Sequence, residues 1–273
     1  LDGLRRCVAS VRGASVRRPF EIVVINDADN SPDMTRFLGE LAQSGGANVV
    51  LQPVRQGFAA AVNRGIGLHR DRDVVVLHSD AEVANDWLDR LAAHAVAGDV
   101  GIVGTYTNSV GTATYPLPRS ANPLPAGQTA ASLDALFARA NPAGAVALPF
   151  VDGPALYLRR ECLRSVGAFD ANPLGGDYGV EIDFCLRAGS AGFRHLLAGD
   201  VFVGHEGHAS FGVRESPGLA NRADEALAKL YPSYPAQLKD IAEREPARAF
   251  ARRVDLLRLA ESPKRVVVFV SHP

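Results

Sequence analysis

Short runs of β-branched residues alternate with amphipathic stretches through the first half of the chain. The runs predict strands at 21–25, 48–51, 73–77 and 100–103. Apolar residues at helical spacing predict a helix at the start of the chain, around Leu4, and further helices near 33–42, 57–68 and 86–97. Such alternation is typical of a mostly parallel sheet with helices on both faces. The pattern therefore predicts an α/β fold.

The second half of the chain has a looser pattern. Residues 105–149 are rich in Tyr, Asn, Pro and Gly, with a short helix predicted near 131–139, and strands follow at 155–158 and 200–203. After about residue 216 the sequence becomes helical and charged, through 220–230 and 247–260, before an apolar run at 265–270 that predicts one more buried strand. We expect a main domain over 1–215, a helical extension or linker over 216–262, and the start of a further α/β domain at 263–273.

Composition and charge narrow the class of protein. With 47% hydrophobic and 22% charged residues, the 273-residue chain has the composition of a soluble globular protein. Its formal net charge of -1 provides no broad basic field, so we expect no nucleic-acid partner. Three scattered cysteines without CxxC spacing indicate a reducing, cytoplasmic environment. No apolar run is long enough to cross a bilayer, so any membrane association would be peripheral, at the inner face.

Two acids stand directly after predicted strands. Asp27 follows the first strand and Asp80 follows the third. Ligands of open α/β sheets bind beyond the carboxyl ends of the strands, which makes these positions candidates for a binding site. An isolated Asp at such a position is more often a turn former or a helix cap.

A second acidic group lies far along the chain. Asp177, Glu181 and Asp183 follow a glycine-rich approach, and the last two fall in the first turn of a predicted helix. Stabilisation of the helix dipole, by about 0.3–1 kcal/mol for each acid, explains one such residue more readily than three.

A histidine follows the strand at 200–203. His205 and Asp80, both at strand ends, would form a sparse pair of nitrogen and oxygen ligands with positions left open for diphosphate oxygens and water. Such a pair suits Mg²⁺ or Mn²⁺ better than a structural zinc ion. A lone histidine at a strand end is otherwise most often a surface residue.

Taken together, six segments resemble the GT-A glycosyltransferases of family two, especially those that build bacterial O-antigen and related surface polysaccharides. The resemblance runs from about residue 4 to residue 212 and rests on EIVVIND, RQGFAAAVNRG, LHSDAEV, VDGPALYLRR, GVEIDFCLR and VGH, at 21–27, 55–65, 77–83, 151–160, 179–187 and 203–205. Each segment alone is a weak match, and their common order is what makes the resemblance specific. It implies a GT-A fold, with the segment 1–215 as the transferase domain.

The resemblance also implies an activity and a set of site residues. We expect an inverting, metal-dependent transfer of a sugar from a nucleotide-diphosphate donor, of UDP or dTDP type, to a glycan or lipid-linked acceptor. Glu181 is the expected base, with Asp183 as a second catalytic candidate, and Asp80 and His205 are the expected metal ligands. The remaining expectations are for the donor, Asp27, Gly57, Asn63, Ser79, Asp80 and Gly153, and for an acceptor wall or lid, Asp177, Tyr178, His208, Ser210 and Phe211.

The chain departs from the family pattern in ways that favour a rival interpretation. His78 stands where the family has Asp or Asn, Val180 replaces the first acid of the catalytic pair, and the opening strand of the fold is missing from the sequence. A non-catalytic domain that binds a nucleotide sugar or a glycan is therefore the main alternative. A nucleotidyltransferase is less favoured, because no glycine-rich basic loop lies near the first strand.

We expect the chain to be part of a longer polypeptide, whose next domain resembles a GT-B transferase from residue 266 onward.

Overall fold

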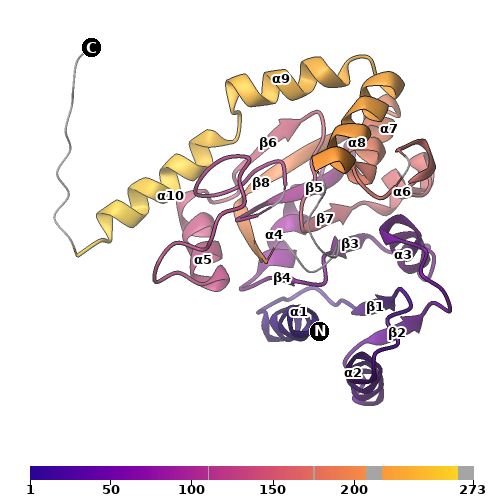
Figure 1. Ribbon diagram of the computed structural model, residues 1–273. Coiled ribbons are helices and arrows are strands. Elements are labelled where there is room, and N and C mark those ends of the chain that lie inside the picture. The colour runs from indigo at the N-terminus through magenta and orange to yellow at the C-terminus, as the bar shows by residue number, and fades with distance from the viewer. Residues whose placement is uncertain (110, 175, 207–216, 264–273) are drawn as a thin grey trace, which may run out of the picture.

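The computed structural model describes residues 1–109, 111–174, 176–206 and 217–263, and the fold is of the α/β class (Figure 1). The strands are β1 (Val23–Asn26), β2 (Asn48–Leu51), β3 (Val74–Leu77), β4 (Ala81–Glu82), β5 (Val100–Thr107), β6 (Ala145–Leu148), β7 (Ala155–Leu158) and β8 (Arg194–His205). The α-helices are α1 (Asp2–Gly13), α2 (Pro32–Gln43), α3 (Phe58–Ile66), α4 (Trp87–His94), α5 (Ala130–Ala140), α6 (Arg160–Val166), α7 (Val180–Ser190), α8 (Pro217–Leu230), α9 (Tyr234–Arg244) and α10 (Arg248–Ala260), with a 3-10 turn at Asn172–Leu174. The periodic patterns located most of these elements, but not β4, β6, α6 and α9.

The larger sheet is mixed and not mostly parallel as the alternating pattern predicted. Its order is β3-β7-β5-β8-β4, with β6 also paired to β8. Only β5 and β8 run parallel in this sheet, and the other pairs are antiparallel. Parallel pairing needs a crossover connection, which α2 provides between β1 and β2 in a separate two-stranded sheet. The antiparallel strands β4, β6 and β7 come from short or irregular segments in which no such alternation is visible.

Two clusters of buried side chains form the core. The larger one contains Phe137, Phe184 and Phe202 and extends to residues of the C-terminal helices. The smaller one joins α1 and α4 to the sheet around Trp87, which is 3% exposed. The sheet is therefore covered by helices on both faces (Figure 1).

The C-terminal helices pack against the rest of the domain. Leu227 of α8 and Val254 of α10 are fully buried, and the hydroxyl of Tyr106 in β5 donates to the backbone carbonyl of Ala247, 2.6 Å away. Figure 1 shows α8 beside α7, and α10 running past α5. The segment 217–260 is therefore a packed helical extension, whereas 264–273, the predicted start of a further domain, lies outside the described residues.

The two sheets are separate, and a cavity lies between them. The two-stranded sheet of β1 and β2, with α2, lies beside the edge of the larger sheet formed by β3 (Figure 1).

In the part of the chain that the structure describes, no helix is long and apolar enough to cross a membrane.

Candidate functional site

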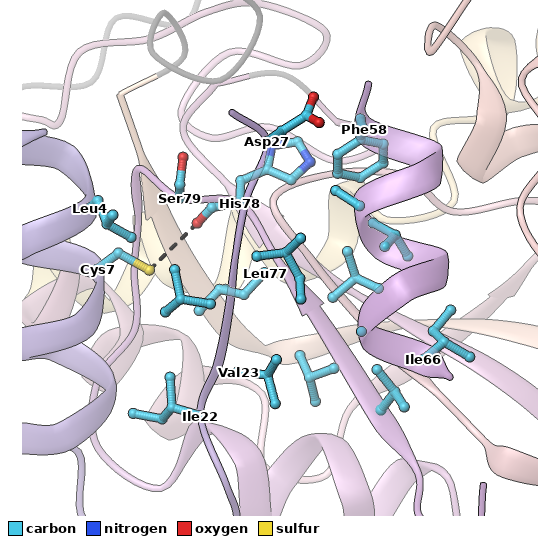
Figure 2. A pocket seen from close by; sticks show the side chains of 18 of the residues that line it. Leu4, Cys7, Ile22, Val23, Asp27, Phe58, Ile66, Leu77, His78 and Ser79 are labelled. Carbon is cyan, nitrogen blue, oxygen red and sulfur yellow. Dashed lines mark hydrogen bonds between the residues drawn. The ribbon is translucent and has the colours of Figure 1, made fainter. Parts of the chain in front are cut away.

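A cavity of about 1890 Å³ lies between α1, β1, α3 and β3. Figure 2 shows its polar end, where Asp27, Ser79 and His78 gather near Phe58, and its apolar wall of Ile22, Val23 and Leu77. The polar end is formed by the residues that follow β1 and β3. This is the position at which open α/β sheets bind ligands.

A short turn carries the first part of the site. β3 ends at Leu77 and β4 begins at Ala81, so that His78, Ser79 and Asp80 form the connection. The backbone N–H of His78 donates to the carbonyl of Pro154, 2.9 Å away, and its carbonyl accepts from Ala81 at 3.1 Å. Asp80 is only 2% exposed. The turn is thus held on both sides by backbone hydrogen bonds.

Strand pairing brings His205 to this turn. His205 is the last residue of β8, and the antiparallel pairing of β4 with β8 places it opposite Ala81. Its Nε2 lies 3.1 Å from Oδ1 of Asp80. The predicted convergence of these two residues is therefore present in the structure.

Asn108 fixes the backbone of His205, and the sequence analysis missed it. Its side chain accepts a hydrogen bond from the N–H of His205 at 2.8 Å and donates one to the carbonyl of the same residue at 3.0 Å. Asn108 directly follows β5, but the strand predicted from the sequence ended at residue 103, so the rule that directed attention to Asp27 and Asp80 did not reach it.

The donor set fits a divalent cation. Ligand atoms of His78, Asp80 and His205 all lie within 4.8 Å of one another. Two donors bound at about 2.1 Å in adjacent positions of an octahedron are about 3 Å apart, which matches the contact between Asp80 and His205. His78, which the sequence pattern set aside as a departure, is part of this cluster.

Glu181 lies at the same site. It occupies the first turn of α7, and its side chain is 11% exposed, with Oε1 3.8 Å from Nε2 of His78. The imidazole rings of His78 and His205 are 5.2 Å apart, in an edge-to-face arrangement. The turn after β3, the end of β8 and the start of α7 thus meet at one place.

Asp183 is bound within the protein. One carboxylate oxygen accepts from the hydroxyl of Tyr231 at 2.6 Å, and the other accepts from Nε of Arg187 at 2.8 Å. The residue is 2% exposed. These contacts tie α7 to the segment that follows α8.

Asp152 is an acid near Glu181 that the sequence analysis did not single out. Its carboxylate accepts a hydrogen bond from the hydroxyl of Thr112. Its backbone N–H donates a hydrogen bond to the hydroxyl oxygen of Thr112, 2.9 Å away. Burial, and to a lesser degree the charge of Glu181, raises the pKa of Asp152 to about 6. Its place before Gly153, inside a segment already recognised, was the available clue.

Asp27 and Asp177 both hold the start of α3. Asp27 accepts hydrogen bonds from the backbone N–H groups of Gln56 and Gly57, at 2.7 and 2.8 Å, and from the side chain of Gln52 at 2.7 Å. Asp177 accepts from the N–H groups of Phe58 and Ala59, at 2.7 and 2.9 Å. The first N–H groups of a helix lack partners inside the helix, so Asp177 satisfies the first two of α3, while Asp27 holds the two residues just before the helix.

Gly57 stands between the two carboxylates. Its φ is +92°, and a Cβ at this position would lie 2.4 Å from Oδ2 of Asp177. A side chain here would thus be both strained and blocked by a fixed carboxylate.

The other predicted donor and acceptor residues lie in different surroundings. Ser79, Tyr178 and Gly57 line the cavity. Asn63 does not line it; its side-chain amide exchanges two hydrogen bonds with the backbone of Phe169, at 2.8 and 2.9 Å. Gly153 has a φ of +137° and follows Asp152. The lid candidates His208, Ser210 and Phe211 lie outside the described residues.

Comparison with known protein sequences gives distant relatives. The chain is 27% identical over 206 residues to the pre-mycofactocin glycosyltransferase of Mycobacterium tuberculosis, covering 75% of this chain and 40% of that protein. It is 25% identical over 234 residues to the uncharacterized protein y4gI of Sinorhizobium fredii, covering 80% of this chain and 24% of that protein. The chain thus spans less than half the length of either relative.

Comparison with solved structures identifies the fold. GalNAc-T7 with UDP, GalNAc and Mn²⁺ matches with a TM-score of 0.57 and 20% identity, over 92% of this chain and 52% of that one. The mannosyltransferase PcManGT from Pyrobaculum calidifontis, in complex with GDP-Man and Mn²⁺, matches with a TM-score of 0.55 and 18% identity, over 96% of this chain and 73% of that one. The fold is that of the GT-A glycosyltransferases.

The sequence profile of one family covers more than half of the chain. It is described as glycosyl transferase family 2 and matches residues 1–167, which include the turn at His78–Asp80 and the strand β7. The matched region includes four of the six segments, those at 21–27, 55–65, 77–83 and 151–160, and supports the assignment to family two. The chain belongs to glycosyl transferase family 2.

Proposed function

We propose that this chain is the transferase domain of an inverting, divalent-cation-dependent glycosyltransferase. It would move a sugar from a nucleotide-diphosphate donor, of UDP or dTDP type, to a glycan or lipid-linked acceptor in the synthesis of bacterial surface polysaccharide. The observation that carries the proposal is the meeting of Asp80, His205 and Glu181 at one site. UDP in GalNAc-T7 and GDP-Man in PcManGT, each with Mn²⁺, support a nucleotide-diphosphate donor and a divalent cation, and the UDP of GalNAc-T7 supports the UDP type.

Asp80 and His205 are the proposed holders of the cation. A divalent cation at this position supplies positive charge to the diphosphate and makes the nucleoside diphosphate a better leaving group. Ser79 and Gly153 would flank the donor. The pairing of β4 with β8 and the clamp of Asn108 keep the two side chains together before any ligand arrives, so that little reorganisation is needed on binding.

Glu181 is the proposed base. In the transfer, an acceptor hydroxyl gives its proton to Glu181, its oxygen forms a bond to the anomeric carbon, and the bond from that carbon to the diphosphate oxygen breaks on the opposite face. The anomeric centre is inverted in this single displacement. A positioned base of this kind contributes roughly 10²–10⁴-fold to the rate.

The contacts of Asp183 support Glu181 over Asp183 as the base. Both oxygens of Asp183 already accept hydrogen bonds, from Tyr231 and Arg187, and the side chain is 3% exposed. Glu181 is the more accessible acid and lies beside the proposed cation site. Asp183 then has a positioning role, because it links α7 to the C-terminal extension.

The donor base would lie against the loop before α3. Oδ2 of Asp27 accepts one hydrogen bond, from Gly57, and retains a lone pair for an N–H of the pyrimidine ring. Asn63 would support the donor site without contacting the donor, because it holds α3 to the loop at Phe169. Asp177 and Tyr178 lie at the edge of the cavity, where an acceptor would approach, and His208, Ser210 and Phe211 remain predictions for a lid.

The departures at residues 78 and 180 do not favour the non-catalytic alternative. Val180 is fully buried in the core, so its side chain does not reach the cleft beside Glu181. His78 lies within the group of potential metal ligands. Neither substitution removes a group from the site as the structure describes it.

Calorimetry and a turnover assay on the full-length protein test the proposal. We expect UDP to bind in the presence of Mn²⁺, and a panel of nucleotide sugars to include one that is turned over with inversion. Glu181→Gln should lower kcat by roughly 10²–10⁴-fold and leave UDP affinity within about threefold. Asp183→Asn is the matched variant, and it should reduce stability more than turnover.

Two outcomes would contradict the proposal. Binding of a nucleotide sugar without any turnover across the panel would support the non-catalytic alternative. Near-native transfer by Glu181→Gln, together with its loss in a folded Asp183→Asn protein, would reverse the assignment of the base.

A further inference from the structure

His78 is placed to take part in cation binding. Its backbone is fixed by hydrogen bonds to Pro154 and Ala81, and its side chain is 7% exposed. Its ring lies edge-to-face with the rings of His205, at 5.2 Å, and of Phe58, at 5.5 Å. The imidazole therefore has little freedom to turn away from Asp80 and His205. Ligand atoms of the three residues lie within 4.8 Å of one another.

Ion pairing with Glu181 is the other role that the geometry allows for His78. The separation of 3.8 Å between Nε2 and Oε1 is beyond hydrogen-bond range, so this contact is a weak constraint on the ring. The cluster of ligand atoms, by contrast, places His78 with two buried residues, Asp80 in the same turn and His205 at the end of β8. The position of His78 among these ligand atoms is therefore more specific than its contact with Glu181.

We propose that His78 is a third protein ligand of the cation and that the site selects first-row transition ions over Mg²⁺. The inference rests on the proposed function, because it assumes that Asp80 and His205 hold a cation there. Asp or Asn at position 78 would offer an oxygen atom, which suits Mg²⁺. Two imidazoles and one carboxylate form a nitrogen-rich set, which favours Mn²⁺ and, more strongly, Co²⁺ and other later ions in the Irving–Williams order.

The arrangement leaves room for the diphosphate. Three ligands from one turn and one strand end would leave an octahedral ion with further positions for phosphate oxygens and water. A closed four-ligand structural site does not have this property.

Cation titrations in the presence of UDP test the proposal on the full-length protein. We expect Co²⁺ to bind the wild-type protein at least roughly 100-fold more tightly than Mg²⁺. Loss of a residue that only supports a ligand costs roughly 10–100-fold in affinity, so His78→Asn should weaken Co²⁺ binding by about 100-fold or more. The Mg²⁺ affinity should change by less than about threefold, because Asn retains an oxygen ligand. His69→Asn removes a histidine outside the cluster and is the control, with both affinities unchanged.

A measurement on the unmutated protein covers the case in which the variant does not fold. Pulsed electron paramagnetic resonance of bound Mn²⁺, with histidine labelled by ¹⁵N, counts the coordinated imidazoles. Two are expected, and one would overturn the proposal. Equal Co²⁺ affinity of a folded His78→Asn protein, with binding still dependent on Asp80, would overturn this inference alone. Absence of cation binding to the wild-type protein with UDP would overturn the proposed function as well.

Discussion

Two groups of acidic residues near the polar end of the cavity use their carboxylates in opposite ways. Asp27 and Asp177, beside β1 and α3, accept five hydrogen bonds from the protein itself, four of them from backbone N–H groups. Asp80, after β3, lies against the imidazole of His205, within a group of nitrogen and oxygen atoms that suits a cation. The first group holds a loop in shape, and the second group gathers ligands.

The difference shows that position relative to a strand predicts where a side chain lies but not which atoms it contacts. All three acids lie at the polar end of the cavity or next to it, and for Asp27 and Asp80 this is expected because they lie beyond the carboxyl ends of strands. Their roles depend on whether N–H groups of a helix start or imidazoles of a distant strand face them. Variants of both groups test this comparison.

Asp80→Asn should have the largest effect on the cation site. The variant loses an anionic ligand, so its Mn²⁺ affinity should fall by roughly 100-fold or more, because even the loss of a supporting residue costs roughly 10–100-fold. Calorimetry with UDP present measures this affinity. Asp27→Asn is the matched variant from the other group: it should weaken UDP binding, but at a saturating UDP concentration it should bind Mn²⁺ within about threefold of the wild-type protein. Equal Mn²⁺ affinity of the wild-type protein and Asp80→Asn would remove the distinction between the two groups.

Sequence patterns predicted the candidate residues of the site but not the contacts that bring these residues together. Asp80, His205 and Glu181 were identified because they follow strong strand patterns or lie in a glycine-flanked helix start. β4 has only two residues and leaves no periodic pattern, yet its pairing with β8 sets Asp80 beside His205. The clamp by Asn108 and the place of His78 in the cluster also depend on long-range pairing, which a single sequence does not display.

The fold was predictable to a similar degree. Helices and strands with clear periodicity were found, whereas the direction of the strands was not. β6 lies in a segment in which Pro and Gly hide the pattern, and β7, although predicted, gives no sign in its own residues that it runs antiparallel to β3 and β5. The bond from Tyr231 to Asp183 shows why the role of an acid in a helix start stays open in sequence analysis. The partner comes from a helical extension whose packing is invisible at that stage.

A histidine at the other end of β8 sharpens the comparison with His205. His195 is 2% exposed, and burial lowers its pKa from 6.5 to about 4. The folded protein therefore keeps this ring neutral, whereas the unfolded chain takes up a proton near pH 6.5. The stabilisation linked to His195 is fully present above that pH and is lost as the pH falls to 4. The loss amounts to about 3 kcal/mol in the free energy of unfolding.

Urea unfolding at a series of pH values measures this loss. His195→Leu should show a smaller decline between pH 6.5 and 4 than the wild-type protein, and His69→Asn, at a half-buried position, should follow the wild-type curve. Parallel curves for the wild-type protein and His195→Leu would show that His195 does not contribute. Addition of Mn²⁺ should not alter the difference, because His195 is separate from the cation site.

Asp177→Asn should have the smallest effect of the three, and it decides between a structural and an acceptor-binding role. Asparagine can accept only with one oxygen, so one of the N–H groups of Phe58 and Ala59 would face an amide N–H instead of an acceptor. The free energy of unfolding should fall by about 2 kcal/mol, the upper range for loss of a helix N-cap. Asp33→Asn removes an exposed charge from another helix start and should change stability by less than about 0.5 kcal/mol. A folded Asp177→Asn protein with wild-type stability and a raised KM for the acceptor would instead place Asp177 with the ligand-binding residues, because its carboxylate would then be worth more to a bound sugar than to α3.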